Sequence, residues 1–416
     1  MRPTVVLLGT LDTKGTEYDY FRRCLAEAEV DVILVDTGIH EPQGPEPDVD
    51  RNEVSRLGGS SIAELIEAND RAHALDVMSL GASAVLRRLR DDGKLDAVAG
   101  LGGTGGSTLI SRAMQTLPVG VPKLLVSTVA SGDTCPYVGD TDIAMMNSIV
   151  DIAGINRISS RIIANAAGAV AGMAKVVPPE DTGQRPVVGA TMFGLTTPCV
   201  TTARQYLEEH GYEVIVFHAT GSGGRALENL VDAGMVDAML DITTTELADN
   251  LVGGVFSAGP ERLTAAARAG IPQVVSVGAI DMVNFGAAST VPQKFENRTF
   301  HRHNDTVTLM RTTGEECDQL GREIAVKLNA AKGPVALYLP LKGTSGIATE
   351  GKSFHDPAAD ARLWTAIQEN SGHGIEIHAH DCDINEPGFG LAMAARLHNM
   401  YTDIHNEADH DRTITP

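Results

Sequence analysis

The sequence predicts an α/β protein built from two Rossmann-like subdomains, each a doubly wound parallel sheet, with a cleft between them. Short apolar runs alternate with helix-like patterns along the chain, which favours parallel strands covered by helices on both faces. At 416 residues the chain is too long for one ordinary core. The pattern of the first half returns in the same order in the second, which indicates internal duplication.

The first subdomain is expected to span residues 1–180 and to alternate strands with helices. Its apolar runs are bounded by glycine, proline and polar residues, as buried strands usually are. The expected elements are strand 4–9, loop 10–15 and a following helix, strand 32–35, helices within 62–90, strands 95–99 and 123–128, and a helical segment at 149–175 that leads to the junction.

The second subdomain, residues 181–416, is expected to repeat this order. Four pairs of segments carry the repeat: 187–194 echoes 7–10, 214–221 echoes 32–38, 237–241 echoes 96–100, and 270–273 echoes 120–123. In open parallel sheets, ligands bind beyond the carboxyl ends of the strands. We therefore expect the loops of both subdomains to line the cleft.

A glycine-rich turn stands out in the first subdomain. The apolar run at 95–99 is followed by five glycines within seven residues, 100–106, and then by a helix-like pattern. Glycines allow close approach of the backbone to a bound group, and a helix N-terminus attracts phosphate or carboxylate. The turn predicts an anion site, although such turns also serve only to pack a helix closely on a sheet.

The glycine spacing does not identify the anion. Gly100, Gly102 and Gly105 satisfy G-x-G-x-x-G, but a dinucleotide site places this fingerprint on the first strand, with an acidic residue about 20 positions later. Here the strand is not the first, and the nearest acid beyond Val126 is Asp133. The chain also lacks a G-x-x-x-x-G-K-[ST] motif.

Composition narrows the class of protein. A formal net charge of −21 disfavours binding to nucleic acid or to an anionic membrane, so an anion must be held by local donors. Five scattered cysteines without C-x-x-C spacing indicate reduced thiols and no structural zinc. The apolar run at 5–8 is too short for a signal peptide. We expect a cytoplasmic protein.

A second candidate site lies in the polar run 293–304. Arginines and histidines are dense there, which suits an anion clamp, a general base or metal ligands; the side chains predicted to act are Arg298, His301 and His303. The alternative is a solvated loop whose side chains have charged partners. Beyond it, a helix is expected to start after Thr312 or Thr313.

An edge strand is expected near the end of the chain. Residues 374–383 alternate apolar and polar side chains, so Glu376, His378 and His380 share one face. These residues are acceptable zinc ligands, but an exposed polar face of a strand is a simpler explanation of the pattern. No metal ligand is therefore predicted.

Several segments together resemble an uncharacterised family found in bacteria and plants. The segments are 9–15 (Gly-Thr-Leu-Asp-Thr-Lys-Gly), 102–107, 284–286, 303–304 with 308–312, and 354–357. The likeness runs from Val5 to about Phe389. Its plant member resists tobamoviruses by binding the viral replication protein and continues into a further domain, so virus inhibition is not carried over. The resemblance implies two Rossmann-like subdomains and ATP with Mg²⁺ as ligand.

The leading expectation is thus a cytosolic protein that binds ATP with Mg²⁺. Backbone N–H groups of the turn would hold phosphate, Lys14 would neutralise charge, and Asp12 or Asp36 would hold magnesium or a ribose. The predicted nucleotide-binding residues are Gly9, Asp12, Thr13, Lys14, Asp36, Gly102, Gly103, Thr104, Gly105, Gly106 and Ser107.

Two other classes of function stay open. One is an enzyme acting on a small carboxylated or phosphorylated metabolite through the 298–303 segment. The other is a regulatory module that uses nucleotide to set its shape for a partner. In each case we expect a homo-oligomer, no nucleic acid and no membrane.

Overall fold

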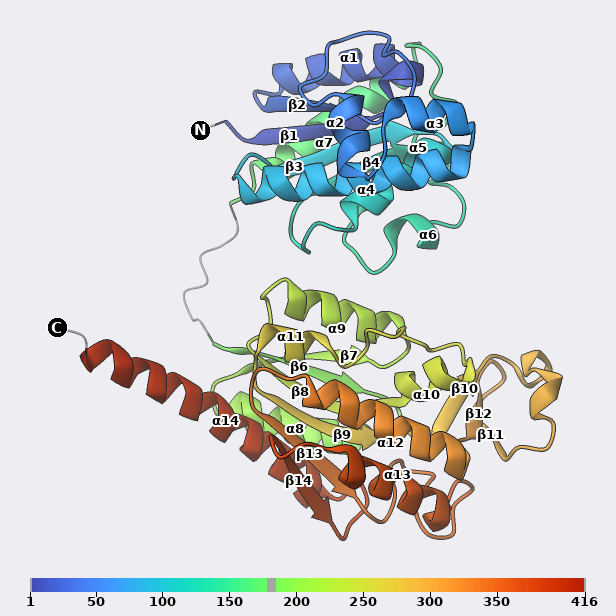
Figure 1. Cartoon of the computed structure of the whole chain (residues 1–416), viewed down its shortest axis with the longest axis vertical. Helices are drawn as coiled ribbons and strands as arrows, with labels where there is room; N and C mark the ends of the chain where they lie inside the picture. Colours follow the sequence, from blue (N-terminus) through green and yellow to red (C-terminus); the bar gives the residue numbers. More distant parts are fainter. Residues whose placement is uncertain (1, 178–184, 415–416) are drawn as a thin grey trace. The chain divides into compact units, whose positions relative to one another are not determined.

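The computed structural model describes residues 2–177 and 185–414, with side chains described up to 406. The chain divides into two compact units, Met1–Glu180 and Asp181–Pro416 (Figure 1). Each unit has its own sheet and its own helices, and each is described here by itself.

The first unit is built on a five-stranded parallel sheet of order β2-β1-β3-β4-β5. All five strands are short. Their bounds are β1 Thr4–Gly9, β2 Asp31–Asp36, β3 Ala97–Gly102, β4 Lys123–Ser127 and β5 Ala144–Asn147.

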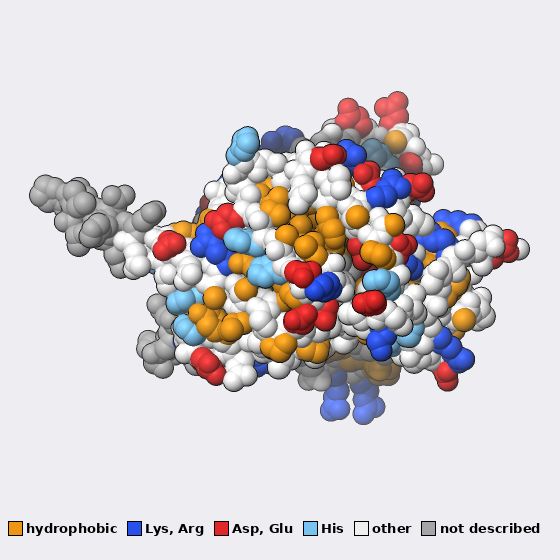
Figure 2. Space-filling view, turned by 90° about the horizontal axis from the view of Figure 1, so that it is seen from below, with side chains coloured by type: hydrophobic (Ala, Val, Ile, Leu, Met, Phe, Trp, Pro, Cys, Tyr) orange, Lys and Arg blue, Asp and Glu red, His pale blue; other side chains and the backbone are white. Residues whose placement is uncertain are grey.

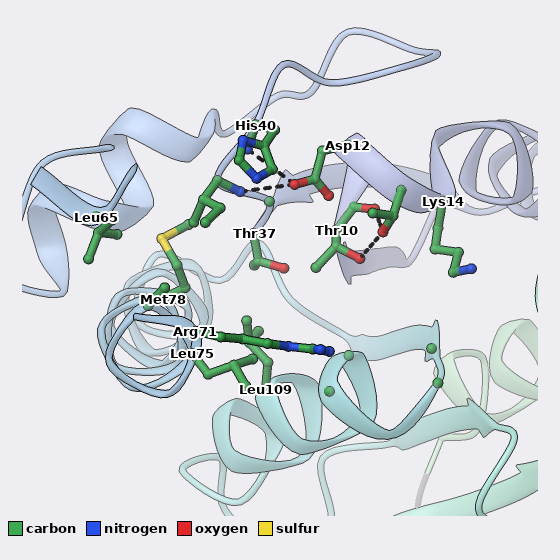
Figure 3. A pocket seen from close by; sticks show the side chains of 18 of the residues that line it. Thr10, Asp12, Lys14, Thr37, His40, Leu65, Arg71, Leu75, Met78 and Leu109 are labelled. Atoms are coloured by element: carbon green, nitrogen blue, oxygen red, sulfur yellow. Dashed lines mark hydrogen bonds between the residues drawn. The ribbon is translucent and has the colours of Figure 1, made fainter. Parts of the chain in front are cut away.

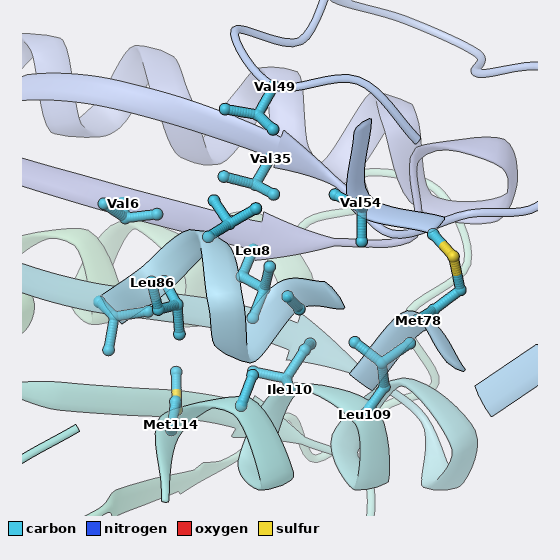
Figure 4. Packing of buried hydrophobic residues seen from close by; sticks show 14 of the residues in the cluster. Val6, Leu8, Val35, Val49, Val54, Met78, Leu86, Leu109, Ile110 and Met114 are labelled. Carbon is cyan, nitrogen blue, oxygen red and sulfur yellow. The ribbon is translucent and has the colours of Figure 1, made fainter. Parts of the chain in front are cut away.

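Apolar side chains of the first sheet point alternately to two separate cores. Along β1, Val6 and Leu8 belong to one core, and Val5 and Leu7 belong to the other. Figure 4 shows the first of these cores, in which Leu86 and Ile110 come from the covering helices. This two-sided burial explains why the strands read as continuous apolar runs.

Helices cover both faces of this sheet. α4 and α5 supply one core, and α1 and α7 supply the other. The helix bounds are α1 Leu11–Glu27, α2 Arg51–Leu57, α3 Ile62–Ala68, α4 Arg71–Asp91, α5 Thr104–Met114, α6 Cys135–Val138 and α7 Ser159–Ala174.

The first unit departs from the expectations in three places: residues 149–158, the strand β5, and residues 11–15, which belong to α1 and not to a loop. Helix α7 begins only at Ser159, so residues 149–158 are not helical as predicted. Ile149 there has a φ of +62°, a left-handed conformation that a β-branched residue rarely adopts and that no helix contains. The fifth strand, β5, was not predicted because none of its four residues, Ala-Met-Met-Asn, is β-branched or aromatic, the types that favour strands.

The second unit is built on a six-stranded parallel sheet of order β14-β13-β9-β8-β6-β7. α8 and α14 pack on one face of it, and α10, α12 and α13 on the other. The bounds are β6 Val187–Met192, β7 Glu213–His218, β8 Ala238–Thr243, β9 Gln273–Gly278, β13 Val335–Pro340, β14 Ile375–His380, α8 Thr197–Glu209, α9 Ser222–Asp232, α10 Thr245–Val252, α11 Ala265–Ala269, α12 Gly314–Asn329, α13 Pro357–Asn370 and α14 Pro387–Ile414.

A small antiparallel sheet of order β10-β12-β11 is added to the second unit. Its strands are β10 Met282–Phe285, β11 Phe300–Arg302 and β12 Thr308–Arg311, with 3₁₀ turns at Ala288–Thr290 and Gln293–Phe295. The sequence had suggested that 281–286 only ends a strand, whereas 282–285 form one of their own. The helix predicted after Thr312 or Thr313 is confirmed, because α12 begins at Gly314 with Thr313 as its cap.

The two large sheets have the same topology. Numbered within each unit, both run 2-1-3-4-5, and the second adds a sixth strand at the edge. The predicted fold class, two Rossmann-like units with a repeated order of elements, is therefore confirmed. The cleft predicted between the units stays a prediction. Across residues 2–177 and 185–414, the helices include none long and apolar enough to cross a membrane.

Candidate functional site

The strand order of the first unit indicates a binding site at the carboxyl ends of β1 and β3. In a 2-1-3-4-5 sheet, the chain reverses its direction of winding between strands 1 and 3, and ligands bind beyond the carboxyl ends of the strands there. Tyr18 ties these strands together: its hydroxyl lies 2.6 Å from the Leu8 carbonyl and accepts a hydrogen bond from Leu101 N–H at 2.8 Å.

A cavity of about 690 Å³ opens at this point. Its walls come from four parts of the first unit: the start of α1, the loop after β2, helices α3 and α4, and the start of α5 (Figure 3). One end is polar and the other apolar. The lining includes Thr10, Asp12, Thr13, Lys14, Thr37, His40, Leu65, Arg71, Leu75, Met78, Leu109 and the turn Gly102–Gly106.

The polar end contains the uncapped N-terminus of α5. Ser107 N–H donates to the Gly103 carbonyl at 2.8 Å, which makes it the first donor inside the helix. The N–H groups of residues 103–106 precede it and have no helical acceptor. No side chain in the described part of the chain caps this helix. The α5 start therefore offers four donors and the positive end of a helix dipole.

Arg71 brings a second positive charge to the same place. It is the first residue of α4, and its Nη2 atom is 3.0 Å from where a Cβ atom on Gly105 would lie. Figure 3 shows its guanidinium extended across the cavity beside Leu75 and Leu109. Among the residues that the structure describes, no carboxylate pairs with Arg71. A cation and a helix N-terminus repel each other unless an anion lies between them.

Two carboxylates organise the opposite wall: Asp12 belongs to the cavity lining, and Asp36 lies outside it. Asp12 Oδ2 accepts from Ile39 N–H at 3.2 Å and from His40 N–H at 3.1 Å. Asp36 Oδ1 accepts from Leu11 N–H at 3.1 Å and from the backbone N–H two residues further on at 2.8 Å. These bonds fix the loop after β2 against the start of α1.

The remaining oxygens of this wall lack partners. Asp12 Oδ1, Asp36 Oδ2 and Thr37 Oγ1 are all buried, and none has a hydrogen-bond partner within the described residues. Burial raises the pKa of Asp36 to about 6, and the nearby Asp12 carboxylate adds to the rise, while backbone donors oppose it. Native proteins rarely leave buried acceptors unpaired, so the oxygens of the lining residues Asp12 and Thr37 indicate a place for donors from outside the chain.

The apolar end of the cavity lies between α3 and α4. Leu65, Leu75 and Met78 line it, and Figure 3 shows Leu65 and Met78 at the opposite end from Lys14. Flat apolar groups bind in such slots, because burial of apolar area drives the association.

The structure brings most of the predicted nucleotide-binding residues together around the cavity. Several of them already have hydrogen-bond or packing partners within the chain. Residues 12–14 belong to the first turn of α1, not to a loop as predicted, because Lys14 N–H already bonds to the Thr10 carbonyl. Lys14 Nζ contacts the Ile152 carbonyl. Gly9, Asp36 and Ser107 lie outside the lining: a Cβ at Gly9 would clash with Tyr18, and the Ser107 hydroxyl bonds to Ser127 at 2.6 Å. Gly9 and Ser107 occupy packing positions, and the predicted ligand roles of all three residues stay predictions.

The second candidate segment lies on the small sheet of the second unit. Arg298 is held by both oxygens of Glu316, at 2.9 and 2.6 Å. His301 Nδ1 lies 3.2 Å from Ser353 Oγ, and His303 is exposed after β11. Arg298 thus already has its carboxylate partner, which is what the solvated-loop interpretation expects. The catalytic roles of these three residues stay predictions.

In the second unit, the helix start corresponding to α5 is closed. Thr244, Thr245 and Glu246 at the start of α10 are each 0% exposed. Glu246 Oε1 also accepts the N–H groups of Gly221 and Gly224, at 2.7 and 3.1 Å, at the start of α9. The start of α10 is therefore closed by burial, and at the start of α9 a carboxylate takes the position that an anion would need.

The histidines of β14 are packed rather than grouped as ligands. His378 and His380 both stack on the Tyr338 ring, and Glu376 pairs with Arg396 at 2.5 Å. On the face of the second unit seen in Figure 2, histidines lie beside apolar side chains, and acidic and basic groups alternate. Within the described residues, no three His, Cys, Asp or Glu side chains are grouped to hold a metal ion.

Sequence reasoning missed the residues that shape the cavity most. Arg71, Thr37 and Met78 stand in no recognisable motif. Their positions follow from the strand order and from the path of α4 past the start of α5. The available signal was the cap before α4: Asp70 Oδ1 accepts from Ala72 and His73 N–H, which fixes where α4 begins.

Comparisons with known proteins identify the family. Residues 3–179 match the N-terminal domain, and residues 185–401 the C-terminal domain, of the uncharacterised protein family UPF0261. A UPF0261 protein of Clostridium tetani is 48% identical over 96% of this chain and 99% of its own length. A UPF0261 protein of Rhizobium meliloti is 44% identical over 97% of this chain and 99% of its own.

A plant relative is similar to nearly all of this chain. The ToMV resistance protein Tm-1(GCR237) of Solanum lycopersicum is 40% identical over 94% of this chain, which spans 55% of that protein. Among solved structures, the UDP-GlcNAc 2-epimerase of Methanocaldococcus jannaschii matches 66% of this chain and 83% of its own at 10% identity and a TM-score of 0.22, too weak to bear on the ligand. The two domain matches and the relatives of similar length show that the chain belongs to the UPF0261 family.

Proposed function

We propose that this protein binds a nucleoside phosphate, ATP with Mg²⁺ in the first instance, in the cavity of its first unit. The observation that carries the proposal is the uncapped start of α5 facing the unpaired guanidinium of Arg71. Four backbone N–H groups, a helix dipole and a bidentate cation are together a strong set of donors for a phosphate.

The rest of the cavity suits the rest of a nucleotide. The apolar end between Leu65 and Met78 would take the base, and the volume of about 690 Å³ lies within the usual range for small-molecule sites. Magnesium binds phosphates with few protein carboxylates and keeps several waters. Magnesium would therefore arrive bound to the phosphates of the nucleotide. Asp12, which lines the cavity with Lys14, is a carboxylate that the bound magnesium could contact.

The proposal places the protein in the cytoplasm, where nucleotides are abundant. Its five cysteines, all described by the structure, are free thiols, which suits a reducing compartment.

Isothermal titration of the full chain with Mg-ATP tests the proposal. We expect saturable binding, and we expect inorganic tripolyphosphate to compete for the same site because the polyphosphate contacts lie at the α5 end. Absence of binding by both ligands at millimolar concentration, with a folded protein, would refute it.

A further inference from the structure

Three buried oxygens at the cavity are not explained by a phosphate alone; Asp12 and Thr37 belong to the lining, and Asp36 does not. Asp12 Oδ1, Asp36 Oδ2 and Thr37 Oγ1 are buried without partners, while the other oxygen of each carboxylate is saturated by two backbone N–H groups. Thr37 is only 2% exposed, and Figure 3 shows its side chain directed into the cavity.

The position of these oxygens along the cavity matters. In Figure 3, Thr37 lies between the apolar end, at Leu65 and Met78, and the polar end, at Thr10 and Lys14. A ligand that fills both ends must place its middle section beside Thr37 and Asp12. In a nucleotide, that middle section is the ribose.

The chemistry of the three oxygens selects the partner. An ionised carboxylate only accepts hydrogen bonds, so its free oxygen needs a donor. Sugar hydroxyls are donors, whereas phosphate oxygens are acceptors and repel a carboxylate. Mg²⁺ also binds carboxylate oxygens, so the experiment below separates a bound cation from a hydroxyl donor.

Resting on the proposed function, we infer that Asp12 and Thr37 recognise the ribose hydroxyls of the ligand. The protein then prefers ribonucleotides to deoxyribonucleotides. Asp36 lies directly before Thr37 and fixes it by holding the Leu11 and Gly38 N–H groups, so it acts as a positioning residue.

Two isosteric variants test the inference. Thr37→Val removes only the unpartnered hydroxyl, so it should leave stability unchanged or raise it slightly, since an unpaired buried hydroxyl is costly. Asp12→Asn keeps an oxygen for the Ile39 and His40 N–H groups and replaces the free oxygen by a donor. Thermal unfolding checks that both variants are folded.

Binding is measured by titration with the Mg²⁺ complexes of ATP, 2′-deoxy-ATP, 2′,3′-dideoxy-ATP and tripolyphosphate. We expect the unaltered protein to bind ATP about tenfold or more tightly than dideoxy-ATP. Both variants should lose this preference and bind tripolyphosphate as before.

Other outcomes overturn the inference in distinguishable ways. Equal binding of ATP and dideoxy-ATP by the unaltered protein removes ribose recognition and leaves the nucleotide proposal intact. A preference that survives in both variants assigns it to other residues. Loss of Mg²⁺ dependence in Asp12→Asn, with the ribose preference retained, assigns these oxygens to the cation. If the unaltered protein binds neither ATP nor tripolyphosphate, the proposed function itself is refuted.

Discussion

The guanidinium of Arg71 lies against the first turn of α5, with Nη2 3.0 Å from the position of a Cβ atom on Gly105. A side chain at position 105 would push the guanidinium away, so glycine and arginine are matched here. Two residues 34 positions apart thus place positive charge and free N–H groups on one wall of the cavity.

Replacement of Arg71 should therefore weaken anion binding without affecting the fold. Because the guanidinium has no partner in the described chain, Arg71→Gln breaks no ion pair, and the unfolding midpoint should not change. Loss of a charge-assisted contact to phosphate should weaken Mg-ATP and tripolyphosphate binding by about tenfold or more. Titration calorimetry measures both affinities.

Arg87→Gln is the matched control, because Arg87 is an exposed arginine on the same helix, away from the cavity lining. Its affinity for both ligands should equal that of the unaltered protein. An equal loss in the two variants would mean that net charge, and not the position of Arg71, governs binding.

Stability should depend on pH through Asp36. The folded state raises the pKa of this carboxyl from 3.8 to about 6, so it holds the proton more tightly than the unfolded chain does. The resulting stabilisation is complete below about pH 4 and is lost as the pH rises through about 6. Asp36→Asn removes this pH-dependent contribution to stability, because an amide does not titrate.

Urea unfolding of both proteins without ligand, at several values between about pH 4 and pH 7, measures the effect. Relative to the unaltered protein, Asp36→Asn should gain roughly 2–3 kcal/mol in the free energy of unfolding over this range. A constant difference at all pH values would show that Asp36 has an ordinary pKa.

Each chain should bind one nucleotide despite its two similar units. In the second unit, the start of α10 is buried, and Glu246 accepts the N–H groups of Gly221 and Gly224. Titration calorimetry, with the concentration of folded protein known, should give a stoichiometry near one nucleotide per chain. A stoichiometry near two would show that the second unit opens.

The core of the second unit should depend on Arg262. This residue is 1% exposed and bonds Asp241 through both terminal nitrogens, at 2.5 and 2.7 Å, and Glu246 at 2.6 Å. Arg262→Met would leave these carboxylates buried without a counter-ion, at a cost of about 3–5 kcal/mol in the free energy of unfolding.

The control is Arg268→Met, which removes an exposed arginine paired with Asp232 at 2.7 Å and should cost about 1 kcal/mol or less. Urea unfolding compares the two variants. Similar costs would mean that the buried cluster is no more than a set of surface-like pairs.

The fold could be predicted from the sequence because buried elements have characteristic patterns of apolar residues. Strands buried on both faces read as apolar runs, and the repeat of these runs predicted two units of the same topology. The exceptions are local: β5 is short and has no β-branched or aromatic residue, and the pattern predicts a helix over 149–158, where Ile149 has a positive φ. Backbone conformation at such a residue has no signature in composition.

The site was less predictable, because its parts come from distant segments. The glycine turn was visible as an anion loop, but Arg71 and Thr37 have no motif, and only the fold brings them to the turn. Conversely, Gly9 resembles a ligand-binding glycine but makes room for Tyr18, and Arg298 resembles an anion clamp but pairs with Glu316. A residue type at a suggestive position does not reveal whether its own chain already provides a partner.

The central claim is that an anion binds the free N–H groups at the start of α5. Backbone amide chemical shifts of the full-length protein, followed by NMR during titration with Mg-ATP, test it most directly. The account predicts that the amides of Gly103, Thr104, Gly105 and Gly106 shift first and furthest, with the same midpoint as the calorimetric titration. Saturable binding of Mg-ATP that leaves these four amides unmoved would contradict it.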